Sequence, residues 1–137
     1  MTFWIVVASK DHVESAVRGG FIQAGHGKRS AVERFQRGDV IICYSSKLTF
    51  LCKQPLQAFT AVGQVMGEQA MRVQQTEAFA PYRKQMQWLP CREIAIRPLI
   101  ERLTFIKNKK SWGYVFRVGV LRIPEDDAQI ILAEMHP

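Results

Sequence analysis

The sequence predicts an α+β domain in which a mixed β-sheet curls into a partly closed barrel with short helices around it. Short runs of β-branched and aromatic residues recur along the chain, and the helical stretches between them are brief. These helices do not alternate regularly with the strands, which argues against a doubly wound sheet. With 47% hydrophobic and 23% charged residues, the 137-residue chain has the composition of one globular domain over residues 1–137.

The first half of the chain is predicted to contain two strands and two short helices. Residues 2–8 are β-branched and aromatic, which predicts a buried strand. Asp11 can cap a short helix that a Gly-Gly pair ends. The apolar spacing of residues 31–35 predicts another helix. Residues 40–46 are apolar until a tyrosine and two serines, which predicts a central strand.

The middle of the chain is predicted to be rich in strands. Residues 58–67 follow a loop and predict a strand. Residues 71–76 predict its partner in a hairpin that turns at Gly67 and Glu68. A further strand is expected over residues 83–89, after a loop that contains a proline.

The C-terminal part is predicted to hold a short helix, a strand and a closing helix. Pro98 is acceptable in the first turn of a helix that ends at Leu103. Apolar residues on a period of two predict a strand over residues 115–123. Acidic residues at the start of 124–135 predict a helix whose positive end they stabilise.

An excess of positive charge favours an anionic partner. The chain has 19 Lys and Arg against 12 Asp and Glu, which gives a formal net charge of +7. Such a charge favours nucleic acid through long-range attraction and counterion release. Charge alone does not decide the partner, because many basic proteins bind no nucleic acid.

The cysteines and the apolar runs indicate the compartment. No stretch approaches the roughly 18 apolar residues of a membrane-spanning helix, and the first residues lack the features of a secretory signal. We therefore expect a cytoplasmic protein with no membrane contact. Cys43, Cys52 and Cys91 form no CxxC pair, so we expect thiols that are buried or half-buried instead of a disulfide framework or a zinc site.

No combination of residues in the sequence is typical of an enzyme. Ser9 with Asp11 and His12, or Cys43 with His26, would supply a nucleophile and a base, but there is no nucleophile elbow such as GxSxG. Cys43 also lies in an apolar strand that disfavours a thiolate. The histidines and cysteines match no metal-ligand spacing. We therefore expect no catalytic residues, no metal and no cofactor.

Two segments could contact an anionic ligand. The run GHGK at residues 25–28 places a lysine after two glycines, either to hold an anion or because the glycines serve a tight loop. In the segment 105–117, Lys107, Lys109 and Lys110 could contact phosphates while an aromatic side chain stacks on a base. The alternative for this segment is that its aromatic residues are core and its lysines a solvated turn.

Seven motifs in order carry a resemblance to a known family. They are FWIVVASKDHV, GGFIQAGHGK, GDVIICYSS, PLQAFTAVGQV, FAPYRKQ, IRPLIERLTFI and KSWGYVFRVGVLRI. Together they span nearly the whole chain, which resembles the stand-alone EVE-domain proteins of the PUA-like superfamily. The resemblance implies a PUA-like fold and the recognition of a modified base in DNA or RNA, with the base flipped into a pocket.

The resemblance also implies a set of ligand-binding residues. By position in the motifs they are Trp4, Ser9, Phe21, Gln23, His26, Lys28, Tyr44, Ser45 and Ser46, with Trp112 and Arg117 as further candidates. Gln23 could read a base edge, and Lys28 together with the lysines at 107–110 could steady the backbone. The commoner family pattern reads roughly GVRNYQARN and FYHS where this chain has GGFIQAGHGK and CYSS.

These departures leave the ligand open. The first hypothesis is a non-enzymatic reader of a modified base, and the second is a sensor of a small, nucleoside-like molecule that uses the same pocket. An enzyme acting on RNA or a nucleotide is a third hypothesis. The sequence does not indicate the base, DNA against RNA, or the oligomeric state.

Overall fold

The computed structural model describes all 137 residues and is built around one curled sheet of eight strands. The strand order is β2-β6-β4-β3-β1-β8, with β5 paired to β6 and β7 paired to β4. Only β1 and β3 run parallel, so the sheet is mixed. The strands are β1 Phe3–Val7, β2 Phe21–Ile22, β3 Val40–Lys47, β4 Pro55–Val65, β5 Met71–Arg72, β6 Tyr82–Leu89, β7 Ile94–Ala95 and β8 Val120–Ile123.

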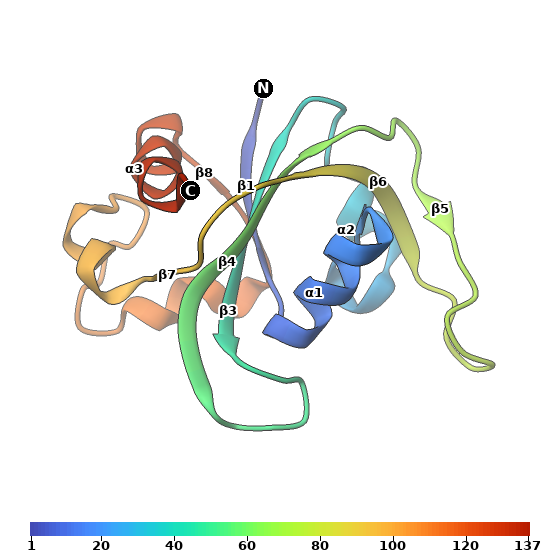
Figure 1. Cartoon of the computed structure of the whole chain (residues 1–137), viewed down its shortest axis with the longest axis horizontal. Coiled ribbons are helices and arrows are strands. Elements are labelled where there is room, and N and C mark those ends of the chain that lie inside the picture. Colours follow the sequence, from blue (N-terminus) through green and yellow to red (C-terminus); the bar gives the residue numbers. More distant parts are fainter.

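Short helices lie on both sides of this sheet (Figure 1). The α-helices are α1 Lys10–Gly19, α2 Arg29–Glu33 and α3 Glu125–Met135, and the 3₁₀-helices are η1 Gly25–Gly27, η2 Arg97–Arg102 and η3 Trp112–Val118. The half-barrel with a few short helices confirms the predicted α+β fold. No helix is both long and apolar enough to cross a bilayer.

The sheet separates two hydrophobic cores. Along β1, Phe3 and Ile5 face one core, while Trp4 and Val6 face the other, because successive side chains of a strand point to opposite faces. The first core is covered by η2, η3 and α3, and the second by α1, β2 and α2. Burial on both faces explains why β1 and β3 read as nearly continuous apolar runs.

The predicted hairpin between residues 58–67 and 71–76 is wrong. β4 pairs with β6 over Val62–Val65, and β5 is a two-residue strand that pairs with β6 elsewhere. Gly67 does not turn the chain back, because its amide donates to the carbonyl of Gln85 in β6. β6 supplies the buried Met86 opposite Val65, whereas residues 71–76 are largely exposed and have little apolar surface to pack against β4.

The predicted strand over residues 115–123 is half correct. Only β8 is extended, and residues up to Val118 form η3. Gly119, whose φ is 79°, ends η3 and allows the backbone to turn into β8. Phe116 lies in η3 and is buried against Tyr44. The apolar residues that suggested one strand therefore belong partly to a helix and partly to a strand.

Candidate nucleic-acid interface

The guanidinium group of Arg83 in β6 is surrounded by three side chains. They are Phe21 in β2, Gln23 just after β2, and Gln75 in the loop after β5. The guanidinium carbon lies 3.8 Å from the centre of the Phe21 ring. Nε donates to Oε1 of Gln23 at 2.9 Å, and Nη2 donates to Oε1 of Gln75 at 3.0 Å. The antiparallel pairing of β2 with β6 brings Phe21 and Gln23 beside Arg83. We call these four residues the Arg83 cluster.

The chemistry of the Arg83 cluster fixes the orientation of both amides. A guanidinium group has no acceptor, so Gln23 and Gln75 must turn their carbonyl oxygens toward it. Their NH2 groups therefore point elsewhere and make no hydrogen bond within the chain. Arg83 forms no ion pair with a carboxylate, and its partial burial lowers its pKa. The cluster is positive and rich in donors.

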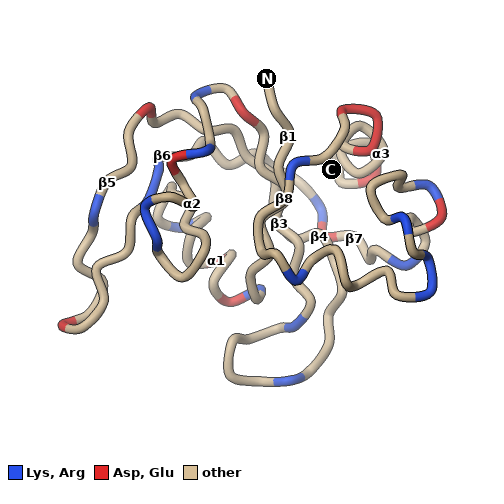
Figure 2. Tube along the Cα trace, turned by 180° about the vertical axis from the view of Figure 1, so that it is seen from behind, with Lys and Arg blue, Asp and Glu red and all other residues tan.

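Further positive charge surrounds an aromatic ring next to the Arg83 cluster. The guanidinium carbons of Arg29 and Arg72 lie 5.9 and 6.0 Å from the ring centre of Tyr82. Arg72 and Lys28 are exposed, and neither forms an ion pair. Figure 2 shows Lys and Arg bands on α2, β5 and β6 at this side of the molecule. We call Lys28, Arg29, Arg72 and Tyr82, together with the Arg83 cluster, the basic face; it spans both faces of β6, because Tyr82 and Arg83 are consecutive in this strand and point to opposite sides.

The GHGK loop supports this face. Gly25, His26 and Gly27 all have positive φ, of 57°, 59° and 81°. A Cβ on Gly27 would lie 2.6 Å from Cβ of Pro81 and 2.9 Å from the Phe79 ring, so only glycine allows the loop to pack there. His26 and Lys28 are exposed at the surface of the loop. The helix that follows, α2, has five residues and is too short to form an anion site of its own.

The serines predicted for the site lie near the ends of β1 and β3 instead. The Ser9 hydroxyl donates to Oδ1 of Asp11 at 2.5 Å, and Ser9, not Asp11 as expected, is the N-cap residue of α1. The hydroxyl of Ser45 is buried and lies 2.8 Å from that of Thr60. Ser46 is exposed. These hydroxyls therefore have local partners or face solvent away from the Arg83 cluster.

Trp4 is part of the core on the α1 and α2 side. Its ring packs edge-on against Phe35, with the ring centres 5.3 Å apart, and Arg34 lies over it at 4.8 Å. Its indole Nε1 donates to Oδ2 of Asp39 at 3.0 Å. The ring is 6% exposed, so it offers almost no surface to a ligand.

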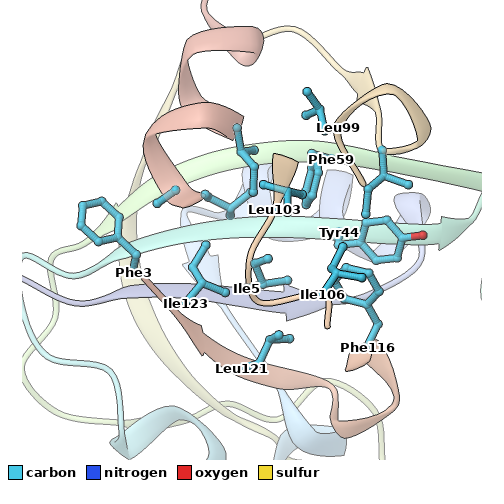
Figure 3. Close-up of a cluster of buried hydrophobic side chains, with 14 of the residues drawn as sticks. Phe3, Ile5, Tyr44, Phe59, Leu99, Leu103, Ile106, Phe116, Leu121 and Ile123 are labelled. Carbon is cyan, nitrogen blue, oxygen red and sulfur yellow. The ribbon is translucent and has the colours of Figure 1, made fainter. Parts of the chain in front are cut away.

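Tyr44, Trp112 and Arg117 lie on the other side of the sheet from the Arg83 cluster. The Tyr44 ring stacks on Phe116, with the ring centres 4.1 Å apart (Figure 3). Burial raises the pKa of Tyr44 to about 12. Trp112 is half-buried beneath the guanidinium of Arg97, whose Nε also donates to Gln57. Arg117 is exposed.

The lysines of the 107–110 segment follow the same core and differ from one another. Nζ of Lys109 donates to the carbonyl oxygens of Ile100 and Leu103, both at 2.8 Å, and so ties the segment to η2. Lys107 and Lys110 are exposed and form no ion pair. Only these two lysines extend into solvent to meet a partner.

No side-chain hydrogen bond joins Ser9 to His12 or Cys43 to His26, although Ser9 is hydrogen-bonded to Asp11. No three His, Cys, Asp or Glu side chains lie close enough together to hold a metal ion. Burial raises the pKa of the Cys43 thiol to about 12, which disfavours a reactive thiolate. Cys43 is buried and Cys91 half-buried, as expected, whereas Cys52 is exposed. His12 stacks on Phe50, with the ring centres 5.1 Å apart.

The sequence indicated part of the basic face and missed the rest. It pointed to Phe21, Gln23, His26 and Lys28, which the structure brings to one side of the molecule. Arg72 and Arg83 appeared only as positive charges, because the pairing of β5 and β2 with β6 is needed to place them together. Gln75 comes from an irregular loop and has no signal in the sequence.

A curled mixed sheet that forms a half-barrel, with short helices on both faces, is the architecture of a PUA-like domain. The chain belongs to the EVE domain family, whose model matches residues 2–134. Relatives include a UPF0310 protein of Mycobacterium avium, 46% identical over 135 residues that cover 98% of each chain. A UPF0310 protein encoded in the gntR 5' region of Bacillus licheniformis is 45% identical over 127 residues, covering 93% of this chain and 86% of that protein.

Two solved structures share the fold at low sequence identity. The YTH domain of Zygosaccharomyces rouxii MRB1, solved with N6-methyladenosine RNA, has a TM-score of 0.63 and 17% identity, covering 99% of this chain and 87% of that one. Human THYN1, solved with DNA containing 5-methylcytosine, has a TM-score of 0.56 and 12% identity, covering 100% of both chains. These similarities establish the PUA-like fold.

Proposed function

We propose that this EVE domain is a non-catalytic binding domain that recognises a modified base in DNA or RNA and uses the basic face to do so. The observation that carries the proposal is the Arg83 cluster, where a half-buried guanidinium is stacked on Phe21 and oriented by two amides without any carboxylate beside it. Aromatic rings beside unpaired positive charge are typical of surfaces that bind single strands.

The relatives of the fold support this proposal. MRB1 was solved with RNA that contains N6-methyladenosine, and THYN1 with DNA that contains 5-methylcytosine. Both ligands are nucleic acids with a methylated base. The net charge of +7 and the position of Arg29, Arg72 and Lys28 on one face suit the same class of partner.

Within this proposal the predicted residues take different parts. Gln23 is half-buried, its NH2 group has no acceptor within the chain, and it is suited to donate to an acceptor on a base edge. His26 and Lys28 are exposed on the GHGK loop that follows Gln23 in the chain. Trp4 and Tyr44 contribute to the cores that hold the sheet in shape, and Trp112 and Arg117 lie on the other side of the sheet.

The test compares modified with plain oligonucleotides. Labelled single-stranded and duplex DNA and RNA, each plain or with N6-methyladenine or 5-methylcytosine, are titrated with the protein and followed by fluorescence anisotropy. We expect one modified strand to bind at least about tenfold tighter than its plain counterpart, a difference of about 1.4 kcal/mol. Gln23→Ala should reduce this preference because it removes the donor.

The control variant is Gln129→Ala, which removes an exposed amide from α3 on the other side of the sheet. It should retain the preference of the unaltered protein. Equal binding of plain and modified strands would contradict the proposal. Thermal stabilisation by free nucleosides without any binding of oligonucleotides would instead favour a small-molecule sensor.

A further inference from the structure

Arg83 is a charged group without a counter-charge in the chain. Arg29, Arg37 and Arg102 each form an ion pair with a glutamate, but Arg83 has only the neutral oxygens of Gln23 and Gln75. A guanidinium that loses part of its hydration normally gains an anion in exchange. Here the anion must come from outside the chain.

The Arg83 cluster also has unused donors and no competing acceptors. A guanidinium has five N–H groups, and two of those of Arg83 are used by the glutamine carbonyls, which leaves three. The NH2 groups of Gln23 and Gln75 have no acceptor in the chain either. A ligand that fits must therefore present several acceptor oxygens and negative charge.

We propose that the Arg83 cluster is a phosphate site that holds one phosphodiester group of the bound nucleic-acid strand, and this rests on the proposed function. The fork of the guanidinium matches two phosphate oxygens, and the NH2 group of Gln75 beside it can donate to the same phosphate while that of Gln23 is left for the base. The Phe21 ring and the two carbonyls hold the guanidinium in place before the strand arrives, so little side-chain entropy is lost on binding.

The surroundings favour a strand over an acidic protein segment. Tyr82 precedes Arg83 in β6 and points to the opposite face of the strand, where the guanidinium carbons of Arg29 and Arg72 lie 5.9 and 6.0 Å from the centre of its ring. A charged fork on one face of β6, with an aromatic ring and further charges on the other face, suits a polymer that is long enough to reach both and in which phosphates alternate with flat bases. An acidic peptide offers carboxylates without stacked rings at that spacing.

The first experiment measures binding of plain and modified oligonucleotides to Arg83→Lys and Arg83→Gln. Lysine keeps the charge but lacks the fork, so Arg83→Lys should weaken both oligonucleotides by the same factor, about tenfold, and leave their ratio unchanged. Arg83→Gln should in addition lower the slope of log K against log salt by about 0.7 for a single strand. Arg122→Gln removes an exposed charge from β8 and is the matched control.

A second variant avoids dependence on the folding of the Arg83 variants. Gln75→Glu changes an exposed loop residue and places a carboxylate beside Arg83, where it competes with a phosphate. We expect it to preserve the melting temperature and to weaken oligonucleotide binding at least about tenfold, because the fork is then occupied. Binding equal to that of the unaltered protein would overturn the phosphate site.

The outcomes separate this proposal from the proposed function. If Arg83→Lys abolishes the preference for the modified base but leaves binding of the plain strand intact, Arg83 reads the base, and the phosphate site is wrong while the proposed function stands. If the unaltered protein binds no oligonucleotide, the proposed function fails. Inorganic phosphate, titrated while the Nε–H resonance of Arg83 is followed by NMR, then decides the phosphate site: a shift absent with chloride supports it, and no shift overturns it.

Discussion

At the scale of single residues, the buried carboxylate of Asp39 connects the start of the chain to the turn before β3. It accepts hydrogen bonds from the amides of Thr2 and Gln36 and from the indole of Trp4. Burial alone would raise the pKa of Asp39, but these hydrogen bonds outweigh it and hold the pKa below the ordinary value of 3.8. The ionised form therefore stabilises the fold.

Replacement of Asp39 by alanine should lower the free energy of unfolding by about 3 kcal/mol at neutral pH, because one buried and two partly buried donors lose a charged acceptor. A group with a lowered folded-state pKa stabilises above its unfolded pKa, and that stability is lost as pH falls through the folded pKa. The difference between Asp39→Ala and the unaltered protein should thus shrink below about pH 4. Urea unfolding at several pH values measures this, and a constant difference down to about pH 2 would contradict it.

The same residues show what the sequence could and could not predict at this scale. Alternation along β1 predicts that Trp4 lies on the opposite face from Phe3 and Ile5, but either face could have been a pocket. Only the helices that cover both faces decide that both are cores. Tyr44 is similar, because a tyrosine at the end of an apolar strand suits a pocket wall until Phe116 is found stacked upon it.

At the scale of elements, Gly27 determines how the GHGK loop packs against the segment that leads into β6. Gly27→Ala requires a residue with a side chain at φ of 81° and a Cβ within 3 Å of Pro81 and Phe79. We expect a loss of about 2 kcal/mol in the free energy of unfolding and weaker oligonucleotide binding, because displacement of Pro81 shifts the neighbouring Tyr82. Thermal melts and anisotropy titrations measure the two effects.

Gly113→Ala is the matched control for this substitution. A Cβ there meets nothing within 4 Å, and its backbone does not lie in the left-handed region. It should change the free energy of unfolding by less than about 0.5 kcal/mol. A similar loss in both variants would show that glycine acts through the flexibility of the unfolded chain instead of through the packing of the GHGK loop.

Elements that depend on local signals were predicted well, and those that depend on distant pairing were not. α1 ends at Gly20, whose φ of 71° provides the expected left-handed cap. By contrast, proximity in the chain predicts a hairpin between residues 58–67 and 71–76 that does not form. β6 pairs with β4 instead, because it brings more apolar surface, and no local pattern in the sequence reveals this.

At the scale of the whole molecule, the sheet divides the positive charge between two sides. The basic face lies with α2, β5 and β6, whereas Lys107 and Lys110 lie with η2, η3 and α3 (Figure 2). The sequence predicted Lys28 and the lysines at 107–110 as parts of one interface, since charge and aromatic content do not encode the side of a sheet. The fold thus turns one expected surface into two.

This division predicts how binding depends on the length of the strand. An oligonucleotide of about four nucleotides can occupy the basic face alone, so the double variant Lys107→Gln and Lys110→Gln should leave its affinity unchanged. A strand of about 20 nucleotides can reach both sides, and the double variant should weaken it and lower its salt slope by about 1.4. Lys109 is left unaltered because it binds the carbonyls of Ile100 and Leu103. Lys53→Gln, in the exposed loop before β4, controls for the loss of charge. If the double variant weakens binding of the short strand as much as Arg83→Gln does, both sides bind one short ligand and the prediction is wrong.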